Sequence, residues 1–275
     1  MSGVALSEEH LDLLLEKVYT AKGWDFRQYR RSSIKRCVER QIALSRRSYH
    51  SYLDLLDSEP SEFNTLFNHI TIKVSEFFRD TEVFQRIENY VIPMTIRRLT
   101  IKGSKTLRIW SCGCAKGEEP LSIAILIHKR MQEMGGDFDV KIFATDIDES
   151  AVNAARKGVF VEDSLKNVDP IMRSQFFQTA NRSFQIIPKI RNLVTFGAHD
   201  IVSHIHLSHM DIILCRNLLI YFEKDLQEKV FEKFYYSLKP GGFIVLGKSE
   251  VPPLSYRENL LDICKKEKIY QKVAQ

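Results

Sequence analysis

The chain has 275 residues, of which 44% are hydrophobic, and a formal net charge of +5 at pH 7. This size and composition predict a globular protein with one large domain, or one domain plus a smaller one. No run approaches the roughly 20 apolar residues that cross a membrane, and the N-terminus lacks the basic and apolar regions of a secretory signal. Because no apolar run is long enough, we expect no membrane insertion. Because a signal is lacking and the five cysteines include no CxxC pair, we expect a reduced cytoplasmic protein.

The positive charge is concentrated in residues 22–47, where nine basic residues face only Asp25 and Glu39. The segment therefore carries +7, and the rest of the chain sums to about −2. A local field of this kind indicates an acidic partner, which could be a protein, a nucleic acid or an anionic lipid.

Residues 1–90 have a helical pattern throughout. Ser7 is a candidate cap for a first helix whose leucines recur at helical spacing. A second helix fits 34–45, and a third fits approximately 62–72.

The second of these helices has two different faces. Ile34, Val38 and Ile42 recur every four residues and form an apolar face. At about 100° per residue, Arg36 and Arg40 lie on the opposite side, as does Arg47 if the helix continues. We call this the arginine face.

From residue 105 onward, short apolar runs alternate with helical segments, which is typical of a parallel sheet with right-handed crossovers. We expect strands at 106–112, 140–146, 211–215 and 243–247, and helices at 120–134, 147–158 and 223–238. Residues 160–197 interrupt the alternation and contain the short runs FQIIP and LVTF. We interpret this segment as an insertion with a small antiparallel piece.

The first strand is followed by SCGCAKGEEP, a turn of small residues that allows a ligand to approach the backbone. It matches neither a GxGxxG nor a Walker A motif. Glu118 and Glu119 suit an ammonium or a hydroxyl donor, although acids also favour a helix start by themselves. The second strand ends at Asp146, where a carboxylate can accept from ribose hydroxyls, while Asp148 can cap the next helix. Together these features favour a nucleoside cofactor.

Five blocks in this part of the chain resemble the CheR family of chemotaxis receptor methyltransferases. They occur in the family's order and are VSEFFRD (74–80), RIWSCGCAKGEEPLSIA (108–124), IFATDID (142–148), ILCRNLLIYF (213–222) and SLKPGGFIVLGKSE (237–250). The resemblance implies an all-α N-terminal domain over 1–72, a linker over 73–95, and a Rossmann-like methyltransferase domain over 96–275. A small β-subdomain would be inserted at about 160–197.

The resemblance also implies the activity, which is methyl transfer from S-adenosylmethionine to glutamate side chains of chemoreceptors, releasing S-adenosylhomocysteine. By position, the cofactor would be bound by Ser75, Arg79, Glu119, Asp146, Asp200, Ile201, Cys215, Arg216 and Asn217. Asp200 stands where family members often carry Asn, and Lys73 also falls where Asn is common. We expect a monomer that binds the cytoplasmic domain of the receptor.

The reaction needs no general base, because a glutamate side chain is already ionised at neutral pH. We therefore expect catalysis by positioning and electrostatics. Arg79 could orient the substrate carboxylate through a forked hydrogen bond. Tyr221 either lies near the transferred methyl group or only packs at a helix start. We predict no metal site, since CxC has no further ligands at the right spacing and His199, His204, His206 and His209 suit a polar loop.

Three explanations remain for the arginine face: a solvated surface, docking on the glutamate-rich receptor bundle, or nucleic acid. We favour receptor docking, with Arg36, Arg40 and Arg47 as contacts, and expect no nucleic acid because no reader motif is present. The segment QTANRSFQI is short and lacks glycine, so we expect activity without a receptor C-terminal tether peptide. The alternatives are a cofactor-binding regulatory module without turnover and a methyltransferase for another substrate.

Overall fold

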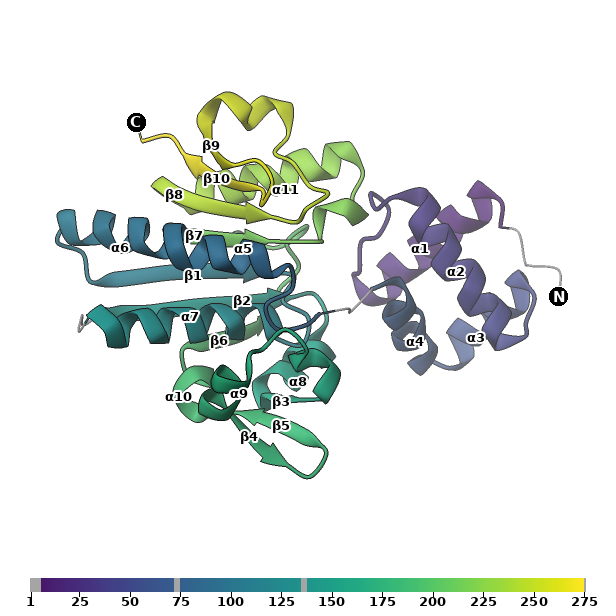
Figure 1. Ribbon diagram of the computed structural model, residues 1–275. Helices are drawn as coiled ribbons and strands as arrows, with labels where there is room; N and C mark the ends of the chain where they lie inside the picture. The colour runs from purple at the N-terminus through teal and green to yellow at the C-terminus, as the bar shows by residue number, and fades with distance from the viewer. Residues whose placement is uncertain (1–5, 72–74, 135–137, 275) are drawn as a thin grey trace. The chain divides into compact units, whose positions relative to one another are not determined.

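The computed structural model describes residues 6–71, 75–134 and 138–274 (Figure 1). They form two compact units, Met1–Ile72 with Tyr221–Lys229, and Lys73–Ile220 with Val230–Gln275. The segment Tyr221–Lys229 thus belongs to the helical unit, whereas the sequence alone suggests that it is part of the domain over 96–275. Among the described residues, no helix is long and apolar enough to cross a membrane.

The first unit is all-α, as predicted. Its helices are α1 (Glu8–Lys22), α2 (Arg31–Ser45), α3 (Tyr49–Ser58) and α4 (Ser61–Ile70). The predicted cap is confirmed, since the Ser7 side chain accepts a hydrogen bond from the backbone N–H of His10. Gly23 ends α1 in the left-handed conformation, with φ of 72°.

Helix α2 confirms the predicted division into two faces. Ile34, Val38 and Ile42 are buried, while Arg36 and Arg40 are exposed. The helix does not continue to Arg47, because Arg46 takes a left-handed φ of 57° and ends it at Ser45. Arg47 is exposed but lies beyond the helix.

The second unit is built on a seven-stranded sheet in the order β6-β2-β1-β7-β8-β10-β9. Its strands are β1 (Thr106–Cys112), β2 (Asp139–Asp146), β6 (Val194–Ala198), β7 (Met210–Cys215), β8 (Leu238–Leu246), β9 (Leu260–Cys264) and β10 (Ile269–Lys272). Neighbouring strands are parallel from β6 to β8, and β10 is antiparallel to both of its neighbours. The sheet is therefore mixed rather than purely parallel.

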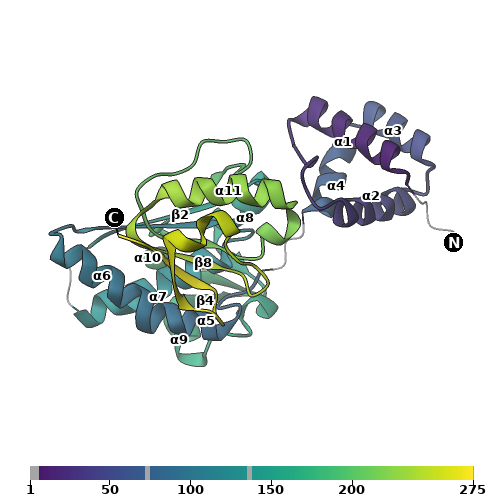
Figure 2. The same ribbon diagram turned by 90° about the horizontal axis from the view of Figure 1, so that it is seen from above.

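Helices cover both faces of this sheet. Figure 2 shows α11 on one face and α5, α6 and α7 on the other. The helices of the second half are α5 (Thr81–Arg86), α6 (Ile92–Ile101), α7 (Glu118–Met134), α8 (Glu149–Lys157), α9 (Pro170–Phe176), α10 (Pro188–Arg191) and α11 (Lys224–Ser237). Burial from both sides explains why all residues of β7 are buried and all but Asp211 are apolar.

The inserted segment differs from the expectation in one respect. A small antiparallel sheet is present, with the order β3-β5-β4 and strands β3 (Val159–Phe160), β4 (Phe177–Ala180) and β5 (Ser183–Ile186). The run LVTF, however, lies in β6, which pairs in parallel with β2 at the edge of the large sheet. Its assignment to the small sheet is wrong, because a short apolar run does not indicate which sheet completes its hydrogen bonds.

Candidate cofactor site at the carboxyl edge of the sheet

The turn after β1 is attached to the end of β2. The backbone N–H groups of Gly113 and Cys114 donate to the Thr145 carbonyl at 2.8 and 3.0 Å. Gly117 has a φ of 94°, and a Cβ there would lie 3.0 Å from Ala155 and from Phe196. Only glycine fits this position without strain. The carboxyl ends of β1, β2 and β7 meet here, where parallel sheets of this class bind ligands.

Asp146 connects the two strand ends. Its Oδ2 accepts from the Ala115 N–H at 2.8 Å, and its Oδ1 accepts from the Asp148 N–H at 3.0 Å. Asp148 caps α8 by accepting from the N–H groups of Ser150 and Ala151, as predicted. Asp146 thus stands at the end of β2, where a carboxylate can accept from hydroxyl groups of a ligand.

The two adjacent glutamates of the turn have different environments. Glu118 is 2% exposed, and burial raises the pKa of its carboxyl, whose Oε2 has no hydrogen-bond partner among the described residues. Glu119 accepts from the Ser111 hydroxyl at 2.7 Å and pairs with Arg216 at 3.2 Å, and its side chain is 14% exposed. The partly accessible Glu119, which pairs with Arg216, is therefore the better candidate for a ligand contact.

Arg216 is the centre of a buried charge network. Its Nη1 contacts Glu119, and its Nη2 donates to the Arg79 carbonyl at 2.9 Å and to Asp80 at 2.5 Å. Lys248 extends the network, since its ammonium lies 2.9 Å from Asp80 and 2.7 Å from Glu82. Arg216 thus connects the segment around Arg79 with the start of α7. The sequence analysis missed Asp80, although it stands at the end of the block VSEFFRD.

The backbone around Arg79 is locally strained. Phe78 and Asp80, on either side of it, have positive φ values of 53° and 61°. Non-glycine residues in this conformation cost free energy and concentrate at functional sites. Nearby, the Ser75 side chain forms a hydrogen bond with the carboxyl of Glu118. Lys73 lies outside the described residues.

The loop after β7 is held by a second buried carboxylate. Glu250 Oε2 accepts from the N–H groups of Gly247 and Asn217 at 2.6 and 3.0 Å, and its Oε1 accepts from the Ile220 N–H at 3.3 Å. Burial raises the pKa of Glu250. Cys215 is fully buried at the end of β7, and Asn217 has a φ of 60°. The role of Glu250 was not recognised from the sequence, where it stands three positions after Gly247.

The loop after β6 is fixed by a lysine. Asp200 closes it by accepting from the Val202 N–H and the Ser203 hydroxyl, both at 2.8 Å. The ammonium of Lys233 donates to the carbonyls of Ile201, Val202 and His204 at 2.8, 2.7 and 2.9 Å. Lys233 lies 32 positions from Ile201 in the sequence, and no motif indicated its role.

The remaining predicted residues lie in the helical unit. Tyr221 ends the 3₁₀ turn Leu219–Tyr221 and, together with Arg36, Cys37 and Tyr29, lines a cavity of about 120 Å³. Arg40 and Arg47 are exposed in the same unit. Over the described ranges, no group of three or more His, Cys, Asp and Glu residues could hold a metal ion.

Comparison with known proteins assigns the family. The SAM-binding domain of the CheR methyltransferases matches residues 73–268, and the all-alpha domain of the same family matches residues 9–71. The chain belongs to the CheR methyltransferase family. It is therefore an S-adenosylmethionine-dependent methyltransferase, as the resemblance implied.

Individual relatives are similar at moderate identity. The chain is 28% identical to a chemotaxis protein methyltransferase of Escherichia coli, over 90% of this chain and 86% of that protein. It is 29% identical to chemotaxis protein methyltransferase 2 of Vibrio cholerae, over 91% and 88%. It also matches an uncharacterised 104.1 kDa protein of Rhodobacter capsulatus at 31% identity, over 88% of this chain but only 25% of that protein.

The charges of this edge fit the cofactor. S-adenosylmethionine presents a sulfonium, an ammonium and two ribose hydroxyls, so carboxylates suit it better than the bare N–H groups and cations that a pyrophosphate requires. Glu119 at the start of α7 and Asp146 at the end of β2 provide such carboxylates. Within the second unit the structure also places Ser75, Arg79, Asp200, Ile201, Cys215, Arg216 and Asn217 on the segments described above.

Proposed function

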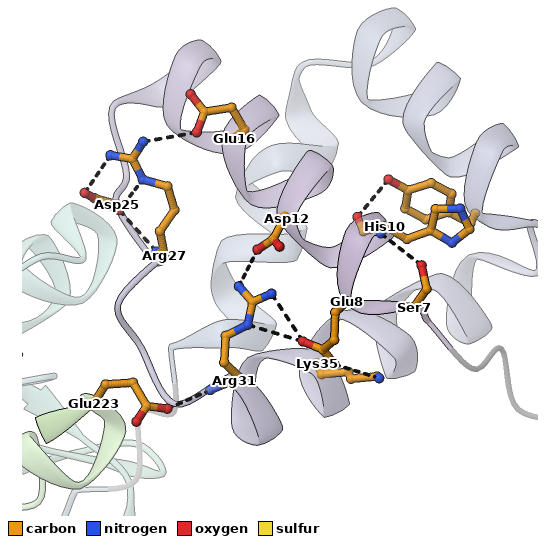
Figure 3. Close-up of polar contacts among 11 residues, drawn as sticks. Ser7, Glu8, His10, Asp12, Glu16, Asp25, Arg27, Arg31, Lys35 and Glu223 are labelled. Carbon is orange, nitrogen blue, oxygen red and sulfur yellow. Dashed lines mark hydrogen bonds and ion pairs between the residues drawn. The ribbon is translucent and has the colours of Figure 1, made fainter.

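We propose that this CheR methyltransferase methylates glutamate side chains in the cytoplasmic domain of chemoreceptors. The observation that supports this most strongly is that some basic residues of α2 form ion pairs with α1 while others form none in the described part of the chain. On the side facing α1, Arg31 pairs with Asp12 at 2.6 Å and with Glu8 at 3.2 Å, and Lys35 pairs with Glu8 at 3.0 Å (Figure 3). Within the described residues, Arg36 and Arg40 form no ion pair.

An acidic substrate could form ion pairs with Arg36 and Arg40. Internal pairing satisfies the basic residues that stabilise the helical unit, whereas Arg36 and Arg40 remain in solvent. Among the described residues, Arg47 donates only to the Ser51 hydroxyl, at 3.3 Å. A glutamate-rich helical bundle presents carboxylates at the spacing of an exposed helix face. This complementarity supports receptor docking over a merely solvated surface.

We further propose that the chemistry depends on orientation rather than proton transfer. When bound, the cofactor supplies an electrophilic methyl group. A substrate carboxylate oxygen forms the new C–O bond as the S–C bond breaks. The electron pair of the S–C bond stays on sulfur, and no proton moves. The protein must then hold the carboxylate in line and exclude water. Arg79 is the candidate for holding it, and Tyr221 is the candidate for packing near the methyl group.

Cofactor binding by the predicted residues is part of the same proposal. We assign it to Ser75, Arg79, Glu119, Asp146, Asp200, Ile201, Cys215, Arg216 and Asn217. Binding of S-adenosylhomocysteine by calorimetry tests this set independently of turnover. If Glu119→Gln and Asp146→Asn both bound the product as tightly as the unaltered protein, the assignment would be wrong.

Transfer of labelled methyl to a purified receptor cytoplasmic domain tests the function. We expect label on the receptor that is released by mild base, as from a methyl ester. Arg79→Ala should reduce turnover at saturating cofactor by about 10² or more, and Tyr221→Phe by less. Base-stable label would indicate another substrate group, and product binding without any transfer would indicate a regulatory module.

Activity without a tether peptide is the last part of the proposal. Strands β4 and β5 form a tight hairpin in which Ala180 pairs with Ser183, with Asn181 at a φ of 55°. The two-residue connection leaves no extended loop to grip a peptide. We expect a receptor with its C-terminal pentapeptide deleted to be methylated as fast as the full receptor. Tight binding of the isolated pentapeptide would contradict this part alone.

A further inference from the structure

A cavity of about 310 Å³ lies in the C-terminal part of the second unit, apart from the cofactor turn. Residues that follow β8 and the β9–β10 hairpin line it. Three of the lining side chains are cations, Arg257, Lys265 and Lys268, and only Asp262 is an acid. The lining of the cavity therefore carries an excess of positive charge.

These cations are available to a ligand. Within the described residues, none of the three forms an ion pair, and Arg257 makes only a long contact, from its Nε to the Pro252 carbonyl at 3.4 Å. Other basic residues of the same unit do pair, as Arg98 does with Asp211 at 2.6 Å. The pairing available elsewhere in the fold is thus missing at this cavity.

The rest of the wall adds a hydrogen-bond donor and apolar surface. Burial raises the pKa of the Tyr270 phenol, and the charge of Asp262 raises it further. The phenol therefore stays protonated at neutral pH and can donate a hydrogen bond. Buried Pro252 and Leu260 supply apolar contacts.

We propose that this cavity binds a small phosphate-bearing molecule of about mononucleotide size. Its volume lies at the lower end of the range for small-molecule sites, roughly 300–1,000 Å³. A guanidinium and two ammonium groups around one space are suited to a phosphate, while the apolar wall can contact a base or a sugar. Because the cations converge on a hollow, a small ligand fits them better than a membrane or a nucleic acid duplex.

The cavity lies at the same edge of the sheet as the cofactor turn but is lined by different residues. Ile269 pairs with Val245 near the carboxyl end of β8, so the β9–β10 turn that carries Lys265 and Lys268 lies at the same edge of the sheet as the cofactor turn. The two sites share none of their named residues. Saturation of the cofactor site should therefore leave the cavity free to bind.

Calorimetric titration of the full chain with uridine 5′-monophosphate, with S-adenosylhomocysteine present at saturation, tests the proposal. We expect one binding site, and affinity for uridine at least about tenfold weaker because it lacks the phosphate. Lys265→Gln/Lys268→Gln should weaken nucleotide binding by about tenfold or more. Lys102→Gln/Lys105→Gln removes two exposed lysines elsewhere in the same unit and should change it less than about twofold.

Retained S-adenosylhomocysteine binding would show that the lysine double variant is folded. If it is not folded, Arg257→Gln provides an independent variant. The proposal is overturned if neither uridine 5′-monophosphate nor inorganic pyrophosphate binds at millimolar concentration. Equal losses in the pocket and control variants would show nonspecific charge attraction and also overturn it. The proposal is also overturned if Lys265 and Lys268 are required for binding an oligonucleotide or phosphatidylglycerol vesicles while no small phosphate-bearing molecule binds.

Discussion

The cofactor edge and the arginine face use charge in opposite ways. At the cofactor edge, Arg216 has a side chain only 2% exposed and meets Asp80, Glu119 and a carbonyl. On α2, Arg36 and Arg40 are exposed and have no ion pair within the described residues. Buried, paired charges fix geometry, whereas exposed, unpaired charges attract a partner over a distance that salt shortens. The comparison predicts different consequences when each set is altered.

The largest effect is expected from breaking the buried network. Arg216→Gln removes the guanidinium that pairs with both Asp80 and Glu119, so that Asp80 retains only Lys248 and Glu119 has no ion-pair partner among the described residues. Breaking a buried pair costs several kcal/mol. We expect S-adenosylhomocysteine affinity to fall by about 10² or more in a calorimetric titration. Arg216→Lys retains the charge but not the fork, and should lose less. Unchanged affinity in both variants would show that the network does not organise the site.

A smaller effect is expected at the loop after β6. Lys233→Met leaves the carbonyls of Ile201, Val202 and His204 without their donor, so the loop should loosen. We predict about a tenfold loss of product affinity in the same titration. Lys229→Gln removes an exposed cation of the same helix and serves as the control. Equal affinities for the two variants would contradict a positioning role for Lys233.

The smallest effect concerns the buried carboxyl of Glu118. Burial raises the pKa of Glu118 in the folded protein, so its stabilising contribution is complete below the ordinary pKa of 4.5 and is lost as pH rises through the raised pKa. Glu118→Gln keeps a neutral side chain at every pH. In urea unfolding, its stability relative to the unaltered protein should therefore increase as the pH rises above about 4.5.

The exposed Glu232→Gln serves as the control for that titration, because it removes a carboxylate of the same unit that lies in solvent. Its stability difference from the unaltered protein should stay nearly constant over the same range. If the Glu118→Gln difference were equally flat, the buried carboxyl would not be favoured in its neutral form.

Local pattern was sufficient for the features that depend on neighbouring residues. Ser7, Asp148 and the apolar positions of α2 were identified from spacing, and the glycine turn and Asp146 were expected together because parallel strand ends converge. The network of Arg216 was not predictable in this way, because its partners Glu119 and Asp80 lie 97 and 136 positions away. The same holds for β6 and for the β9–β10 hairpin, whose pairing depends on the whole sheet.

The central claim is that the arginine face binds the substrate and the carboxyl edge of the sheet binds the cofactor. It is tested most directly by measuring receptor KM and S-adenosylhomocysteine Kd for Arg36→Ala/Arg40→Ala, beside the control Arg97→Ala/Lys102→Ala at exposed cations of the second unit. We predict that the α2 variant raises KM by about tenfold, with a weaker dependence on salt and an unchanged Kd, while the control alters neither. An unchanged KM, or a loss of product binding in the α2 variant, would contradict the claim.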